Sequence, residues 1–239
     1  MRKLICASFL VLAGCVSTTT TQSPSPQPQA QTAQSKATTP TAAQVSRFKT
    51  MVSRVEPVAE RMCRQQTSNL NCDFKVVVDD RPQKSPNAFQ TLDKSGRPIL
   101  AFNLPMIAQV RNDDELAFVM GHEAAHHIER HLDQQRNNAM AGAIILGGLA
   151  ALTGASSGNV DAAADLGANV GARSYSKEFE LEADELGTVI AVRAGYNPLI
   201  GAGFFTKIPD PGDKFLGTHP PNGDRLAVVR RTAAQLGFN

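Results

Sequence analysis

The chain has 239 residues, of which 42% are hydrophobic, and its 24 lysines and arginines nearly balance its 22 aspartates and glutamates. This balance, with no basic run and no aromatic-rich sheet motif, argues against a nucleic-acid partner. The length is enough for one domain with a real core in addition to a leader and a linker.

Residues 1–14 have the features of a secretory signal peptide: a basic start, an apolar stretch of about ten residues and small residues before a cleavage point. The stretch is too short to span a membrane. The sequence L-A-G-C that ends at Cys15 resembles a bacterial lipoprotein signal, which implies cleavage before Cys15 and acyl chains on this cysteine. An ordinary signal peptide with an incidental cysteine is the alternative. Val16, in the position after the cysteine, resembles the pattern that directs lipoproteins to the outer membrane.

Residues 15–44 consist mainly of Thr, Ser, Gln, Pro and Ala, and Lys36 is their only charged residue. Such a composition cannot bury enough apolar surface to offset the entropy cost of ordering the segment. We therefore predict a disordered tether that links a lipid anchor on Cys15 to a folded domain over residues 45–239.

Apolar residues recur at intervals of three and four between Val45 and Met62, which predicts an amphipathic helix. Cys63 and Cys72 flank the end of this helix and the turn that follows. Because export brings the chain into an oxidising compartment, these two cysteines are predicted to form a disulfide. Two buried thiols are the alternative.

The β-branched segment 74–78 predicts a strand, and residues 88–92 and 97–103 predict the two arms of a hairpin. Proline lacks a backbone N–H, so Pro98 predicts that the second arm lies at the edge of the sheet.

The sequence H-E-x-x-H at residues 122–126 lies in a strongly helical stretch for which Asn112 supplies a cap. Residues four apart lie on one helix face, so the imidazoles of His122 and His126 can bind one metal ion. Zinc suits such a pair, and Glu123 is placed beside the metal as a general base for the attacking water. A surface helix with two histidines spaced this way by chance is the alternative.

Two more histidines follow this motif, and neither is predicted to bind the metal. His127 points away from His122, and His131 lies on the opposite side of the helix from His122. Both are predicted to be packed or solvent-facing.

Residues 139–155 are almost entirely Ala, Gly, Ile and Leu, but they are barely long enough for a membrane span and glycines interrupt them. A single crossing would also place His126 and any downstream ligand on opposite sides of the bilayer. We therefore predict Ala/Gly-rich helices or a mobile flap beside the cleft over residues 139–170.

Residues 176–193 predict a second helix, on which Glu180 and Asp184 share one face. Two carboxylates one turn apart can supply a third metal ligand and an acceptor for the other N–H of a ligand histidine. Glu178 and Glu182 compete for these roles, but Glu182 lies about 200° around the helix from Glu180, so both cannot face one ion. A solvated acidic face is the alternative.

Three motifs occur in order along the chain: G-H-E-x-x-H at 121–126, S-K-x-x-E-x-x-A-D at 176–184 and T-H-P-P-x-x-x-R at 218–225. Together they resemble the zinc metallopeptidase family that includes HtpX, BepA, LoiP and the CAAX prenyl proteases. The family has serine-arginine where this chain has serine-lysine at the start of the second motif. The resemblance implies one zinc ion per chain held by His122, His126 and Glu180, with Glu123 as the catalytic base and Asp184 as the hydrogen-bond partner of a ligand.

The third motif adds two candidate catalytic residues. Asn222 is predicted to cap the final helix, which places Arg225 in its first turns with a side chain long enough to reach the cleft. His219 and Arg225 are candidates for stabilising the negative charge that develops on the attacked carbonyl oxygen. A structural role for both residues is one alternative. The resemblance adds another, in which His219 occupies the fourth zinc position at rest.

The sequence therefore predicts an α+β, mostly helical metallopeptidase domain of the gluzincin type with a small edge-exposed β-sheet. Its predicted function is a zinc-dependent endopeptidase of the bacterial cell envelope that holds unfolded or extended polypeptide by pairing with a strand. The resemblance implies degradation of misfolded or unassembled envelope proteins, with assembly factors as further partners. An anchored chaperone with little proteolysis and a zinc amidase acting on cell-wall peptides are the alternatives.

Overall fold

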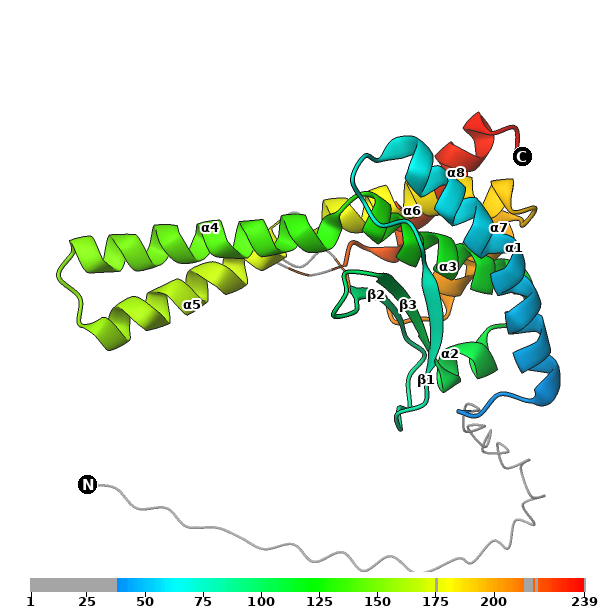
Figure 1. Ribbon diagram of the computed structural model, residues 1–239, viewed down its shortest axis with the longest axis horizontal. Helices are drawn as coiled ribbons and strands as arrows, with labels where there is room; N and C mark the ends of the chain where they lie inside the picture. The colour runs from blue at the N-terminus through cyan, green and yellow to red at the C-terminus, as the bar shows by residue number, and fades with distance from the viewer. Residues whose placement is uncertain (1–37, 175, 213–216, 218, 239) are drawn as a thin grey trace, which may run out of the picture. The chain divides into compact units, whose positions relative to one another are not determined.

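The computed structural model describes residues 38–174, 176–212, 217 and 219–238. The predicted signal peptide, Cys15 and most of the predicted tether lie outside the described residues. The elements, in chain order, are α1 (Ala42–Gln66), β1 (Lys75–Asp79), β2 (Ala88–Leu92), β3 (Pro98–Asn103), α2 (Leu104–Gln109), α3 (Asp113–Ile128), α4 (His131–Leu152), α5 (Ser157–Arg173), α6 (Ser176–Arg193), α7 (Pro198–Gly201), the 3₁₀ helix η1 (Ala202–Thr206) and α8 (Asn222–Gln235) (Figure 1). This mostly helical α+β fold with a small sheet confirms the predicted fold class.

Helix α1 begins inside the segment that was predicted to be a tether. The Thr41 hydroxyl accepts a hydrogen bond from the Gln44 backbone N–H at 3.3 Å, and the Gln44 side chain accepts one from the Thr41 backbone N–H at 2.8 Å. These two reciprocal bonds form a capping box, which satisfies backbone donors that a bare helix start would leave unpaired. The last residues of the predicted tether, 42–44, are therefore helical.

Cys63 at the end of α1 and Cys72 form a disulfide in the structure, with their Cα atoms 5.7 Å apart. Both residues are buried. Closing a loop of this length lowers the entropy of the unfolded chain, which raises the free energy of unfolding by about 2.5–3 kcal/mol. The bond fixes the end of α1 to the segment that leads into β1.

The three strands form one sheet in the order β1-β3-β2, with β1 parallel and β2 antiparallel to β3. The prediction that the second hairpin arm lies at the edge was wrong, because β3 is the central strand. Pro98 is the first residue of β3, a position in which a missing N–H is tolerated. The edge strand of the hairpin is its first arm, β2.

Helix α3 is buried on nearly all sides, between α1, the sheet and α6. Its start is fixed as predicted, since the Asn112 side chain accepts a hydrogen bond from the Glu115 backbone N–H at 2.9 Å. A helix buried all around is held rigidly by its neighbours. The H-E-x-x-H segment therefore lies on a rigid element.

Helices α3 and α6 touch through two glycines. A Cβ atom on Gly187 would lie 2.8 Å from the backbone nitrogen of His122, and a Cβ atom on Gly121 would lie 2.8 Å from the carbonyl oxygen of Gly187. No side chain fits between backbones this close. The contact brings the face of α6 that carries Glu180 and Asp184 against the histidines of α3.

The Ala/Gly-rich segment forms two helices, α4 and α5, that run side by side (Figure 1). Their close contact again depends on glycine, since a Cβ atom on Gly142 would lie 2.0 Å from the Gly167 carbonyl oxygen. This outcome agrees with the prediction of Ala/Gly-rich helices. Within the described residues, none of the helices is both long enough and apolar enough to cross a membrane.

Candidate metal centre

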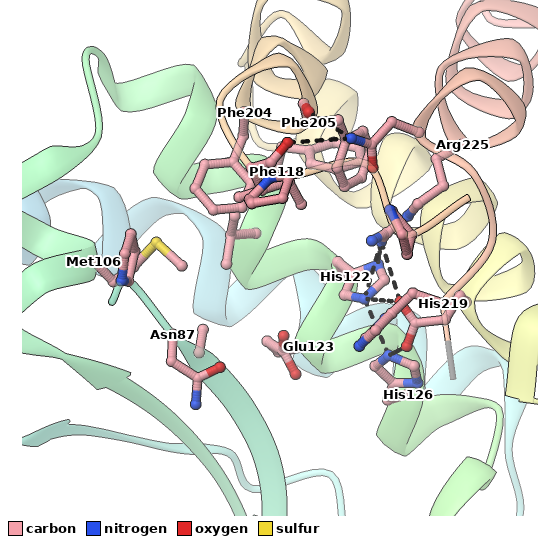
Figure 2. Close-up of a pocket in the computed structure, with 18 residues that line it drawn as sticks. Asn87, Met106, Phe118, His122, Glu123, His126, Phe204, Phe205, His219 and Arg225 are labelled. Atoms are coloured by element: carbon pink, nitrogen blue, oxygen red, sulfur yellow. Dashed lines mark hydrogen bonds and ion pairs between the residues drawn. The ribbon is translucent and has the colours of Figure 1, made fainter. Parts of the chain in front are cut away.

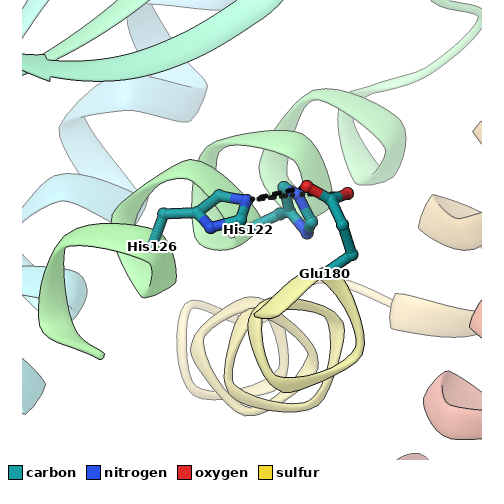
Figure 3. Close-up of side chains that lie close together, drawn as sticks. All are labelled: His122, His126 and Glu180. Carbon is teal, nitrogen blue, oxygen red and sulfur yellow. Dashed lines mark hydrogen bonds and ion pairs between the residues drawn. The ribbon is translucent and has the colours of Figure 1, made fainter. Parts of the chain in front are cut away.

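Three donor groups from α3 and α6 converge at one point (Figure 3). The Nε2 atoms of His122 and His126 are 3.0 Å apart, and the Glu180 carboxylate lies 3.6 Å from the first and 3.4 Å from the second. One ligand atom of each residue lies within 4.8 Å of the others, a spacing at which the three can hold a metal ion. The three side chains are largely shielded from solvent, with exposed fractions of 9%, 17% and 12%.

The second nitrogen of His122 is held by a buried ion pair. Its Nδ1 lies 2.9 Å from the carboxylate of Asp184, whose side chain is fully buried. Two nitrogens of Arg225, Nε and Nη2, each donate to this carboxylate at 2.7 Å. Because Nδ1–H donates to Asp184, the lone pair of His122 Nε2 is directed at the convergence point.

Arg225 reaches the cleft from α8, as the sequence predicted. Besides its bonds to Asp184, its Nη2 lies 3.3 Å from the Glu180 carboxylate. Its guanidinium lies over the ring of Phe205, 3.9 Å from the ring centroid. Phe205 was missed in the sequence, because the adjacent pair Phe204 and Phe205 does not by itself distinguish a core residue from one that contacts an arginine in the cleft. The arginine thus links the carboxylates of α6 to η1.

Asn222 does not cap α8, contrary to the prediction. It is the first residue of the helix, and its side-chain amide donates to the carbonyl oxygens of Phe205 and Ile208 at 3.0 and 3.3 Å. These bonds use the amide to satisfy one carbonyl group in η1 and one just after it, and within the described residues α8 has no side-chain cap.

His219 lies at the open side of the centre, with 56% of its side chain exposed, while Thr218 lies outside the described residues. Its Nδ1 is 3.2 Å from the Glu180 carboxylate. The hydrogen bond to Glu180 raises the pKa of His219 despite the opposing effect of burial. Burial alone would raise the pKa of Glu180, but hydrogen bonds from His126 and His219 hold it well below its usual value. Glu180 is therefore ionised at neutral pH.

Glu123 projects into the space in front of the histidines (Figure 2). It lines a cavity of about 320 Å³ together with His122, His126 and Glu180. The far part of this cavity is apolar and is lined by Met106, Phe118, Val119, Phe204, Phe205 and Ile208. A second cavity of about 270 Å³, on the side of Phe89 and Phe179, also reaches Glu123. Open space thus adjoins this carboxylate on two sides.

His127 is packed, as predicted: its Nε2 lies 2.7 Å from the carbonyl oxygen of Asn71, and burial lowers its pKa. His131 is packed as well, which the prediction allowed, but the side of the helix predicted for it was wrong. His131 is buried and its Nδ1 lies 2.8 Å from Nδ1 of His126, because the helix breaks between the two residues. Burial, followed by the charges of His126 and His122, lowers the pKa of His131 to about 3.

Comparison with known proteins shows that the chain is similar to a family of peptidases. A model of peptidase family M48 matches residues 46–233. The beta-barrel assembly-enhancing protease of Escherichia coli K12 is 33% identical over 147 residues, which cover 52% of this chain and 28% of that protein. The protein of the same name from Yersinia pestis is 31% identical over 138 residues, with the same coverage of 52% and 28%. The chain thus spans less than a third of the length of these relatives.

Proposed function

The chain belongs to peptidase family M48, and from this premise we propose that it is a zinc-dependent endopeptidase. One observation carries the proposal: two imidazoles and a carboxylate converge within 4.8 Å beside the free space that Glu123 lines. Zinc prefers this donor set, and a centre with three protein ligands leaves a position for water or substrate. In the proposal, His122, His126 and Glu180 hold one zinc ion per chain.

Glu123 is the proposed general base. Zinc, when bound, lowers the pKa of a water molecule toward neutrality and polarises the carbonyl that is attacked. The Glu123 carboxylate accepts a proton from the attacking water and returns one to the leaving amine. Its place between two cavities, one on each side of the cleft, allows peptide to extend past it in both directions.

The ion pair of Asp184 with Arg225 is proposed to fix the positions of the metal ligands His122 and Glu180. It fixes the tautomer of His122 through the bond at 2.9 Å, and Arg225 places a positive charge beside Glu180. Fixed dipoles and charges act most strongly where water is excluded, and Asp184 is fully buried. Arg225 is also close enough to the cleft to stabilise negative charge on the substrate.

Strand β2 is the proposed substrate platform. It is an edge strand, and residues 86–88 line the first cavity while Phe89 and Gln90 line the second. The strand therefore follows the cleft past the catalytic centre. Pairing along such an edge uses main-chain hydrogen bonds, tolerates many sequences and requires an extended peptide. Unfolded polypeptides are therefore the proposed substrates.

The cell envelope is the proposed location, with a lipid anchor on Cys15 facing the periplasm and the outer membrane as the favoured membrane. The lipoprotein-like leader and the disulfide between Cys63 and Cys72 support export. The names of the two relatives, which refer to β-barrel assembly, support a role in envelope protein quality control.

The proposal is tested with the purified full chain in mild detergent, incubated with casein or with peptidoglycan fragments. We expect cleavage of casein that a chelator abolishes and added zinc restores. Cleavage of peptidoglycan fragments alone would favour an amidase, and zinc binding without cleavage of either would favour an anchored chaperone.

The identity of the third ligand is tested separately by metal analysis. Glu180→Ala is expected to lose most of its zinc on dialysis, because two histidines alone form an incomplete site. Glu178→Ala is the matched control, since it removes an exposed glutamate from the same helix and should retain one zinc per chain. Equal zinc content in the two variants would show that Glu180 is not a ligand.

A further inference from the structure

The turn between α3 and α4 has an unusual backbone conformation. Helix α3 ends at Ile128 and α4 begins at His131, and Arg130 between them has φ of 57°, in the left-handed region. This conformation is uncommon for a residue other than glycine. The Arg130 side chain is tied to the Ser68 carbonyl oxygen at 2.8 Å, a contact from outside the turn that stabilises it.

The break changes which residues His126 can touch. On an uninterrupted helix, a residue five positions later lies about 140° around the axis and one and a half turns away, too far for a side-chain contact. With the break, Nδ1 of His131 lies 2.8 Å from Nδ1 of His126. The turn therefore places the imidazole of His131 next to the ring nitrogen of His126 that faces away from the proposed zinc position.

His131 is itself held on its other two sides. Its Nε2 lies 3.0 Å from the Glu182 carboxylate, and its ring stacks on Phe179 with centroids 4.6 Å apart and an angle of 14° between the planes. Only 4% of the residue is exposed, so the ring is packed on all sides. Glu182, the glutamate that faces away from the metal, thus has a partner of its own.

The hydrogen bonds fix the position of each ring proton. Nε2 of His126 faces the metal position, 3.4 Å from Glu180, and must lose the proton that it donates to Glu180 before it can bind a metal. Its Nδ1 then carries the proton and donates to Nδ1 of His131. His131 must accept at Nδ1 and carry its own proton on Nε2, where the carboxylate of Glu182 accepts it. Each donor has one acceptor.

We propose that His131, supported by Glu182, is a positioning residue that fixes the tautomer and orientation of His126 and thereby strengthens zinc binding. Asp184 does the same for His122, so each ligand histidine has its own partner on the ring nitrogen that faces away from the metal. The inference rests on the proposed zinc site. It assigns to a neutral histidine the role that carboxylates or backbone carbonyls usually fill.

Zinc affinity, measured by competition with a chromophoric chelator, tests the proposal without reference to catalysis. His131→Phe keeps a ring to stack on Phe179 but removes the acceptor, and its zinc Kd should be about 10–100-fold weaker. His131→Asn places an amide oxygen close to the former Nδ1 and should restore most of the affinity. A wild-type zinc Kd in a folded His131→Phe variant would overturn the proposal.

Glu182 gives a second test if His131→Phe fails to fold. Glu182 is more than half exposed, so Glu182→Ala should fold, and it should bind zinc more weakly than the control variant Glu178→Ala. Equal zinc affinity in these two variants would contradict the proposed role of Glu182 in supporting His131. If the wild-type protein binds no zinc, the proposed function fails. If the wild-type protein binds zinc and cleaves casein, and His131→Phe and Glu182→Ala bind zinc as tightly as the wild type, only this inference fails.

The tautomers provide a readout that a purely structural histidine would not produce. The chain has 5 histidines, so two-bond ¹H–¹⁵N spectra of the zinc-loaded protein can be assigned by single substitutions. We expect His126 to be protonated only at Nδ1 and His131 only at Nε2. Protonation of His131 at Nδ1 would contradict the proposal, because the two rings would then present donors to each other.

Discussion

Glu123→Gln is expected to abolish peptide cleavage while zinc content and thermal stability stay close to those of the wild type. Glutamine has nearly the shape of glutamate, so the buried side chain still fits its place. Its amide cannot accept a proton from water, and loss of general acid–base catalysis lowers rates by about 10²–10⁴. Zinc is retained because Glu123 is not one of the three converging donors.

The measurement combines casein cleavage, metal analysis and a thermal melt of the same preparation. Glu129→Gln is the matched control, because it changes the glutamate that follows α3 and that is absent from the lining of both cavities beside the centre. The control should cleave casein at the wild-type rate. Retained cleavage in Glu123→Gln would show that another group accepts the proton.

The parts of the centre that lie on one helix were predictable, because a helix has a fixed period. His122 and His126 are four residues apart, and Glu180 and Asp184 are four residues apart, so each pair shares a face whatever the rest of the fold does. The meeting of the two helices was less predictable from the residues alone. It depends on the contact of Gly121 with Gly187, and isolated glycines have many other uses.

The errors on His131 and Asn222 have a common physical origin, which is that a tertiary contact overrode a local rule. His131 was placed on the far side of a continuous helix, whereas a left-handed residue held from outside the turn breaks that helix. The error on Pro98 is different: the local rule allows proline on an edge strand or as the first residue of any strand, and Pro98 is the first residue of a central one. Asn222 suggested a helix cap, but its amide satisfies one carbonyl group in η1 and one just after it. Local patterns do not encode these partners.

His219→Ala is expected to lower kcat by about 10²–10³ with little change in KM or zinc content, as for loss of one oxyanion donor. The imidazole lies 3.2 Å from Glu180 at the open side of the centre, and the hydrogen bond to Glu180 raises its pKa. The ring also lines the cavity beside Glu123, where an N–H can donate to negative charge on the substrate. Zinc is retained because His219 is outside the group of converging donors.

The direction of the change separates this role from the alternatives. If His219 instead occupies the fourth zinc position at rest, its removal opens the centre and His219→Ala becomes faster than the wild type. If it only anchors the loop before α8, kcat stays unchanged and the melting temperature falls. His219→Gln discriminates further, since its amide is a donor that can restore part of kcat in the first case. Steady-state kinetics of the three proteins on a fluorogenic peptide therefore assign the residue, and a slower His219→Ala with partial recovery in His219→Gln is the result we expect.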